Sequence, residues 1–192
     1  MCVFASGVNV AALIAVPCGA QSTQPAGRAW GSFATGFGPA SVSKSGDPAF
    51  EGSGQVAASL GYARELARRG AAEAELLGGR SFGAGDCVPE LSPCAPPFSF
   101  VGVSTNFVVS LRGAVGPDRP VASLGPGIYR VAPTESHAVS PRPAVGLQAR
   151  AELPLVTGAR AALAIGVRGL LFPRVHGQSL RIGLLTASLR AW

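Results

Sequence analysis

The sequence contains almost no lysine: of its sixteen basic residues, Lys44 is the one lysine, and the arginines form no continuous run. The net charge of +6 therefore comes from scattered single residues and not from a concentrated basic patch. This dispersion argues against a nucleic-acid partner, whose binding sites gather basic residues on one face or along one helix. Contact with anionic lipid head groups is compatible with the same charge pattern.

Long hydrophobic runs are also missing. After residue 20 no stretch approaches the eighteen consecutive apolar residues expected of a membrane-spanning helix. With 192 residues and 47% hydrophobic side chains, the chain has the length and apolar content for one packed domain.

The first twenty residues, MCVFASGVNVAALIAVPCGA, carry no charge. An apolar run from Val8 to Val16 ends at Pro17 and is followed by Cys18, Gly19 and Ala20. A short apolar run before small residues is typical of a secretory signal peptide, although no lysine or arginine precedes this one. We predict a signal peptide over residues 1–20, a linker over residues 21–26 and a single domain over residues 27–192.

Cysteine is scarce, and removal of residues 1–20 leaves only Cys87 and Cys94, in the segment CVPELSPC. An isolated pair in an exported chain predicts one disulfide, with two free thiols as the alternative. A metal site would need further ligands, and neither His137 nor His176 lies nearby in the sequence. We therefore predict neither a metal nor a cofactor.

Alternation of apolar and polar residues recurs in segments of about ten residues, as in membrane-spanning β-strands. It is strongest over residues 101–112, where Val101, Val103 and Phe107 share one face and Ser104 and Asn106 share the other. Residues 144–153 and 159–169 alternate in the same way. Weaker segments complete a set of eight predicted strands: 28–37, 55–65, 71–81, 121–130 and 179–192.

The connections between these segments alternate between long and short. Residues 38–53, 82–98, 131–143 and 170–178 are the longer ones, whereas ARRG (67–70), GAVGPDRP (113–120) and PLVTG (154–158) are short. Long loops on one side and short turns on the other are typical of outer-membrane barrels. Of the prolines after the leader, only Pro126 lies inside a predicted strand, as expected for a residue that cannot donate to a strand ladder.

A helix is the alternative for residues 60–77, LGYARELARRGAAEAELL. Alanine, leucine, arginine and glutamate are strong helix formers, and Leu60, Ala63, Ala67 and Ala74 recur at helical spacing, but Gly70 lies in the middle. We favour two strands here because the flanking segments already alternate.

The chain resembles the small eight-stranded, porin-like outer-membrane barrels of the OmpA/OmpX-like type. The resemblance rests on the leader, the eight alternating segments, the alternation of long and short connections, the segment PVASLGPGIYR (120–130) and the terminal Trp192. The resemblance covers residues 27–192. It implies an all-β, eight-stranded antiparallel up-and-down transmembrane β-barrel in a bacterial outer membrane. The last strand departs from that pattern, because Thr186, Ser188 and Arg190 occupy the places expected to be apolar. This predicts a bulge or a shifted register near Ala191.

In a barrel of this kind one face of each strand meets lipid and the other faces the lumen. We predict lipid-facing positions at Val101, Val103, Phe107, Val109, Leu147, Leu163 and Ile165. An eight-stranded barrel has a lumen just wide enough for side chains, so charged groups inside it must pair across the lumen. The predicted lumen charge network consists of Glu73, Glu75, Arg112, Arg150, Glu152, Arg160, Arg168 and Arg190.

The function expected from these features is that of a non-enzymatic envelope-structural or surface-interaction protein. Its partners would be outer-membrane lipid and an extracellular or envelope partner that meets the loops, and the barrel would be a monomer. A soluble exported barrel that binds a small apolar ligand inside is one alternative. A lipid-modifying acyl hydrolase is another, because His137 lies beside Glu135, Ser136 and Ser140.

Overall fold

The computed structural model describes residues 28–43, 54–82, 97–133, 141–175 and 178–192, and every regular element in these ranges is a β-strand. Among these residues no helix is long and apolar enough to cross a bilayer. Residues 1–26, Cys87, Cys94, His137 and His176 lie outside the described ranges. The predicted signal peptide, disulfide and histidine site therefore stay predictions. The strands are β1 (Ala29–Gly38), β2 (Ala40–Ser43), β3 (Gly54–Ala67), β4 (Gly70–Phe82), β5 (Phe98–Ser110), β6 (Val121–Pro133), β7 (Arg142–Thr157), β8 (Ala161–Val175) and β9 (Gln178–Ala191).

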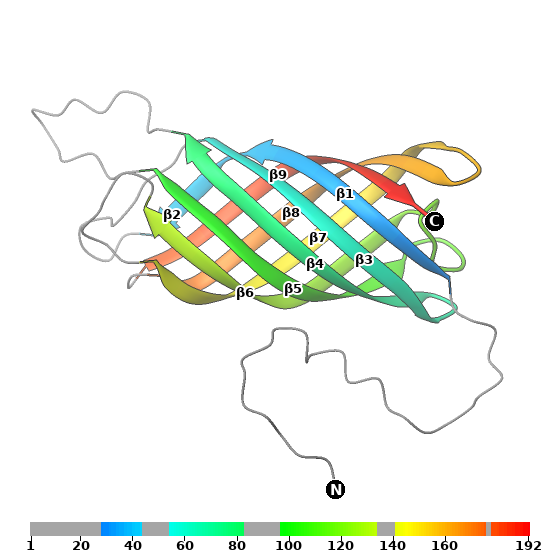
Figure 1. Cartoon of the computed structure of the whole chain (residues 1–192), viewed down its shortest axis with the longest axis horizontal. Coiled ribbons are helices and arrows are strands. Elements are labelled where there is room, and N and C mark those ends of the chain that lie inside the picture. Colours follow the sequence, from blue (N-terminus) through cyan, green and yellow to red (C-terminus); the bar gives the residue numbers. More distant parts are fainter. Residues whose placement is uncertain (1–27, 44–53, 83–96, 134–140, 176–177) are drawn as a thin grey trace, which may run out of the picture.

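The strands form one closed antiparallel sheet in the order β1-β3-β4-β5-β6-β7-β8-β9, and β9 pairs back onto β1 (Figure 1). The short β2 continues the line of β1 beyond Pro39. Both pair with β9 in a single register, Phe37 with Leu185 and Ala40 with Ile182, and Gly183 N donates to Pro39 O at 3.0 Å. β1 and β2 thus act as one barrel strand, and the predicted eight-stranded antiparallel barrel is confirmed.

The helix alternative for residues 60–77 is wrong. These residues lie in β3 and β4, which pair in one register from Gly54 with Phe82 to Glu65 with Ala71 and shift register once before Ala67 pairs with Gly70. Arg68 and Arg69 make the turn between them. Pairing with both neighbours outweighs the helical propensity of the segment, which is a weak preference by comparison.

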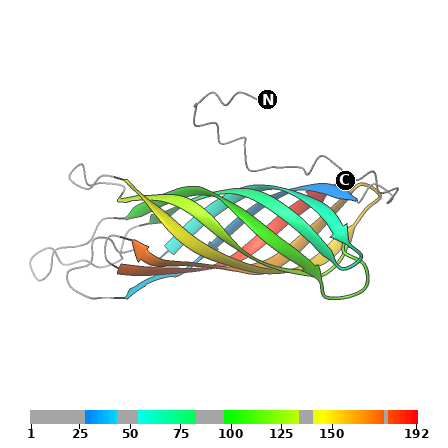
Figure 2. The same ribbon diagram turned by 90° about the horizontal axis from the view of Figure 1, so that it is seen from below.

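The connections alternate between the two ends of the barrel (Figures 1 and 2). The predicted long connection over residues 170–178 is wrong, because β8 extends to Val175 and β9 begins at Gln178, and the connection between β5 and β6, predicted as short, spans residues 111–120. At one end, called here the turn end, β3 joins β4 through residues 68–69, β5 joins β6 through residues 111–120, and β7 joins β8 through residues 158–160. At the other, called the loop end, lie the ends of β4, β6 and β8 and the starts of β5, β7 and β9. The C-terminus lies at the turn end.

Several strands run further than predicted and include prolines that were expected in loops. Pro133, Pro143, Pro154 and Pro173 all lie within strands. Two of them fall where the pairing register shifts, between Pro154 and Val156 in β7 and between Phe172 and Val175 in β8. A bulge leaves one residue out of the ladder, so it accommodates a residue that has no N–H to donate.

Pro126 lies near the middle of β6 and is exposed. It keeps its pairing with Leu147 of β7, but the pairing of β5 with β6 is interrupted between Ser104–Gly127 and Phe107–Leu124. The missing donor of the proline thus coincides with the gap in the ladder. The strands stay close at this gap because residue 125 is glycine, where a Cβ would collide with the backbone oxygen of Thr105.

Side chains alternate between the two faces of the wall along every long strand, with apolar groups outward. Val101, Val103, Phe107, Leu147, Leu163 and Ile165, predicted to face lipid, are 44% to 57% exposed on the outer surface. Val109 points the same way but is half-buried, between Gly70 and Ala122 of the neighbouring strands. A continuous apolar exterior on a closed sheet is the surface that a hydrocarbon solvent requires.

The bulge or shifted register predicted near Ala191 is absent. β9 pairs with β8 and with β1 in unbroken register from Leu185 to Ala191. Trp192 lies just beyond the strand, is 43% exposed, and donates its backbone N–H to Arg160 O at 3.1 Å. The terminal aromatic residue therefore needs no change of face, because it is no longer part of the alternating strand.

An arginine in the middle of the outer surface should destabilise the barrel in a bilayer. Val167, near the middle of β8 and 54% exposed, is the test position. Val167→Arg is expected to lower the free energy of unfolding from lipid vesicles by about 2–4 kcal/mol, measured by urea titration. Ala159→Arg, in the exposed turn at 158–160, is the matched control and should cost far less. Equal effects of the two substitutions would contradict an apolar environment around Val167.

Candidate functional site

The lumen contains a layer of six buried charges, three glutamates and three arginines. β4 contributes Glu73 and Glu75, β7 contributes Arg150 and Glu152, β8 contributes Arg168 and β9 contributes Arg190; all six are 2% to 6% exposed. Each points inward because it occupies the polar phase of its alternating strand. The formal charges sum to zero, as burial in an apolar surrounding demands.

The ion pair between Glu75 and Arg168 joins two of the strands that lie farthest apart around the barrel. In the closed sheet of eight barrel strands, β4 and β8 lie opposite each other. Arg168 Nη2 donates to Glu75 Oε1 at 2.7 Å, and also approaches Ser59 Oγ of β3 at 3.3 Å. Arginine is long enough to reach across the lumen and planar enough to bind a carboxylate on the far side.

Arg150 is the centre of the network and touches all three carboxylates. Its Nη2 donates to both oxygens of Glu73, at 2.9 and 2.8 Å. Its Nη1 lies 3.6 Å from Glu75 Oε1, and its Nε lies 3.4 Å from Glu152 Oε2. One guanidinium thus connects the charges of β4 with those of its own strand.

Arg190 extends the layer to the turn end. Its Nη2 donates to Glu152 Oε2 at 2.6 Å, and its Nη1 donates to the carbonyl oxygens of Pro117 and Arg119, both at 3.1 Å. Those carbonyls belong to the β5–β6 connection. The charge network therefore fixes the position of this connection under the lumen.

Two predicted members of the network lie elsewhere, and their prediction was wrong. Arg112 is exposed, because β5 ends at Ser110 and the chain leaves the sheet before it. Arg160 is exposed in the turn between β7 and β8, since β8 begins at Ala161. The prediction extended the alternating pattern two residues beyond the end of β5 and one residue before the start of β8.

Neutral polar groups that the prediction did not include complete the layer. Asn106 Nδ2 lies 3.3 Å from Glu73 Oε2 and 3.4 Å from Glu75 Oε2. Gln148 Nε2 donates to Glu75 Oε2, and Tyr129 Oη lies 3.3 Å from Gln148 Oε1. Asn106 and Gln148 both stand on the polar phase of strongly alternating strands, which is the sequence signal that could have identified them.

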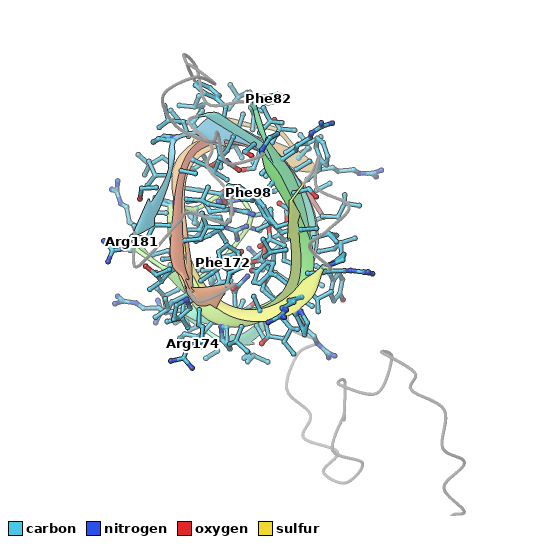
Figure 3. The ribbon with its side chains drawn as sticks, turned by 90° about the vertical axis from the view of Figure 1, so that its left-hand side faces the viewer. Phe82, Phe98, Phe172, Arg174 and Arg181 are labelled. Atoms are coloured by element: carbon cyan, nitrogen blue, oxygen red, sulfur yellow. The ribbon has the colours of Figure 1, made fainter. Side chains whose placement is uncertain are left out.

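Aromatic rings close the lumen on the loop-end side of the charges. Phe172 stands edge-on to Tyr129, with ring centroids 5.0 Å apart, and Phe100 lies 6.1 Å from Phe172 and 6.5 Å from Tyr129. Figure 3 shows Phe98 and Phe172 pointing into the barrel, whereas Phe82, Arg174 and Arg181 lie on its outside. Glycines opposite the rings make room for them, since a Cβ on Gly146 would lie 2.9 Å from the ring of Phe172.

A second apolar cluster closes the turn end. It consists of Trp30, Ala63, Ala71, Val108, Val115 and Val121. Val115 comes from the β5–β6 connection, and its N–H donates to Arg68 O at 2.7 Å, which ties two turns together. The charges are thus enclosed between two apolar layers.

Side chains fill the described part of the lumen. The hollow beside Arg168, lined by Ala34, Ser59 and Leu77, is too narrow to admit a water molecule. The alternative of a soluble barrel with an apolar ligand inside is therefore wrong, because apolar side chains face outward and the centre carries paired charges.

The charge layer contains no unpaired carboxylate, and the described residues contain no metal site. All three glutamates are paired with arginine, and no group of three histidine, cysteine or acidic side chains in these ranges could hold a metal ion. The chemistry that the layer can perform is structural: it cross-braces opposite walls of the barrel.

These features define the class of protein: the fold is that of the small eight-stranded outer-membrane β-barrels. The chain is similar to Neisserial surface protein A (NspA), with a TM-score of 0.62 and 12% sequence identity over 85% of this chain and 95% of that chain. It is also similar to the outer-membrane protein Ail of Yersinia pestis, solved in a phospholipid bilayer nanodisc, with a TM-score of 0.52 and 12% identity over 85% of this chain and 99% of that chain. No protein-family model and no curated protein matches the sequence. At this identity the likeness is one of fold.

Removing one partner of the Glu73–Arg150 pair should lower the free energy of unfolding more than replacing both partners with apolar residues. Arg150→Met leaves Glu73 buried without the nitrogen that donates to both its oxygens, and we expect a loss of about 3–5 kcal/mol in the free energy of unfolding. The double variant Glu73→Leu with Arg150→Met removes both charges and should recover most of that loss. Urea titration of the barrel in vesicles measures both.

The control for this comparison is Arg119→Met, which breaks the exposed contact with Asp118, 3.3 Å long. Exposed pairs contribute at most about 1 kcal/mol, so this variant should resemble the wild type. A double variant less stable than Arg150→Met alone would show that the charge of Glu73 does not require Arg150.

Proposed function

We propose that the chain is a non-enzymatic, non-conducting barrel seated in a bacterial outer membrane, where it serves as an envelope anchor that presents its loop-end segments to the outside. The observation that carries this proposal is the filled lumen: a neutral layer of six charges between two apolar layers, inside an apolar exterior. Such a lumen supplies stiffness and leaves no path for solutes.

The comparisons support a membrane seat and a surface role. NspA is named as a surface protein, and Ail adopts its fold in a phospholipid bilayer nanodisc. We propose that the lipid-facing wall of this chain contacts lipid in the same way, and that an extracellular or envelope partner meets the loop end.

We also propose that the barrel acts as a monomer. Pairing of β1 with β9 closes the sheet, so neither strand presents a row of free backbone donors and acceptors. An open edge is the commonest means by which a sheet recruits another chain.

The filled lumen predicts an absence of conductance. Purified barrel reconstituted in planar bilayers should give no steady current steps above the bilayer background, because the braces Glu75–Arg168 and Glu73–Arg150 cross the only route between the two ends of a closed sheet. A large-pore barrel measured in the same bilayers is the positive control. Reproducible unitary current steps from the wild type would contradict a non-conducting barrel.

The membrane seat is tested by fractionation. Expressed as the full chain, with the predicted leader, in a Gram-negative host, the protein should sediment with outer membranes, need detergent for extraction, and migrate faster on gels before heating than after it. The Val167→Arg variant is the comparison, with a reduced folded fraction. Release of the wild type as a detergent-independent soluble monomer would contradict the proposal.

A further inference from the structure

The outer surface carries a row of small residues that crosses four neighbouring strands. Gly78 of β4 pairs with Ala58 of β3, Ala58 with Thr35 of β1, and Thr35 with Ala187 of β9. All four lie on the outward phase of their strands. Three strand spacings of about 4.8 Å give this row a length of roughly 14 Å.

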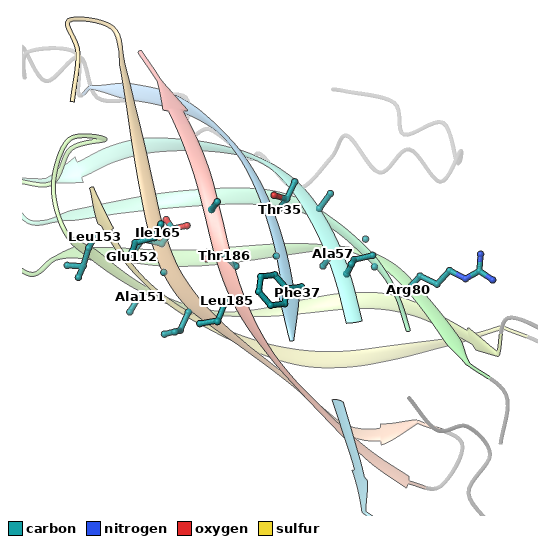
Figure 4. Close-up of a pocket in the computed structure, with 18 of the residues that line it drawn as sticks. Thr35, Phe37, Ala57, Arg80, Ala151, Glu152, Leu153, Ile165, Leu185 and Thr186 are labelled. Carbon is teal, nitrogen blue, oxygen red and sulfur yellow. The ribbon is translucent and has the colours of Figure 1, made fainter. Parts of the chain in front are cut away.

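Large side chains border the small-residue row on both sides. Toward the loop end the next outward row holds Val56, Phe37 and Leu185, 43% to 64% exposed. Toward the turn end it holds Leu60, Phe33 and Leu189, 46% to 58% exposed. The small-residue row and the loop-end row together line an open apolar groove on the wall, with a volume of about 1300 Å³, which continues along the outer surface to Ile165 and Leu153 (Figure 4).

Packing of the wall does not require the groove. A Cβ on Gly78 would make only ordinary contacts, the nearest at 3.6 Å from Phe100 O. Ala58 and Ala187 are exposed, so larger side chains would extend into the groove and not into a neighbouring strand. The groove is thus open to an occupant.

One end of the groove carries a positive charge. Arg80, the register partner of Val56, is exposed beside Gly78 and lines the groove at its β4 end (Figure 4). Gly78 lies close to the loop end of β4, and Ala187 lies close to the turn end of β9, so the groove descends from Arg80 toward the turn end. Among the described residues no carboxylate lies within ion-pair distance of Arg80.

We propose that this groove binds one phosphate-bearing membrane lipid, with the phosphate at Arg80 and an acyl chain laid over Gly78, Ala58, Thr35 and Ala187. The inference rests on the proposed membrane seat. A cation at the headgroup end and an apolar channel leading from it match the two halves of an anionic lipid of the loop-end leaflet.

The test counts lipids that stay bound. The mature barrel is reconstituted with equal amounts of phosphatidylglycerol and phosphatidylcholine, extracted in mild detergent, and examined by native mass spectrometry. The wild type is expected to retain one lipid, mostly phosphatidylglycerol. Ala58→Leu with Ala187→Leu fills the groove and should lower retention about tenfold. Arg80→Ala should remove the preference for phosphatidylglycerol.

Matched controls lie on the same outer surface away from the groove. Ala72→Leu with Ala74→Leu adds the same bulk at two exposed positions of β4, and Arg130→Ala removes an exposed outward arginine near the loop end of β6. Both should retain lipid as the wild type does. If the filled groove keeps its lipid, or if Arg130→Ala loses the preference as Arg80→Ala does, the site is overturned.

The gel shift on heating separates this result from the membrane seat. A wild type that folds into vesicles but shows no preference between the two lipids refutes the lipid site alone. A wild type that fails to enter vesicles refutes the proposed function.

Discussion

The ion pairs that span the lumen, Glu75 with Arg168 and Glu73 with Arg150, are the interaction on which the rest of this structure depends. They join β4 to the strands on the opposite side of the barrel at distances of 2.7 to 2.9 Å. A charge enclosed in a narrow lumen is costly unless it is paired. Three carboxylates and three guanidiniums therefore have to meet in one layer, and the strands must close at the register that brings them together.

Neutrality inside allows an uninterrupted apolar surface outside. Because the polar phase of each strand is satisfied within the lumen, the other phase is free to carry Val, Leu, Ile and Phe toward the exterior. The aromatic layer around Tyr129 and Phe172, and the turn-end cluster around Trp30 and Val115, keep water from the charges at both ends. Arg190 links the charge layer to residues 111–120 between β5 and β6, so the lumen side chains and the turn end of the barrel stabilise each other.

Much of the fold could be predicted because strand alternation reports directly which face of a residue is buried. Eight strands, their two faces and six of the inward charges follow from a period of two. Errors gather at strand ends. Arg112 and Arg160 continue the alternating pattern in the sequence but lie beyond the last paired residue, and Trp192 follows β9 without the predicted bulge. Pro154 and Pro173 were predicted in connections but lie in strands, because register shifts in β7 and β8 accommodate residues that a regular ladder would exclude.

By itself the sequence determined which face of each alternating segment points outward, and that both signs of charge face inward. These are local properties, set by the alternation of neighbours along one strand. Only the tertiary structure decided that Arg150 meets Glu73, that Arg168 reaches Glu75, and that Gly78, Ala58, Thr35 and Ala187 line up in one groove. Those contacts join residues far apart in the chain, and they depend on the register at which eight strands close, which no single strand encodes.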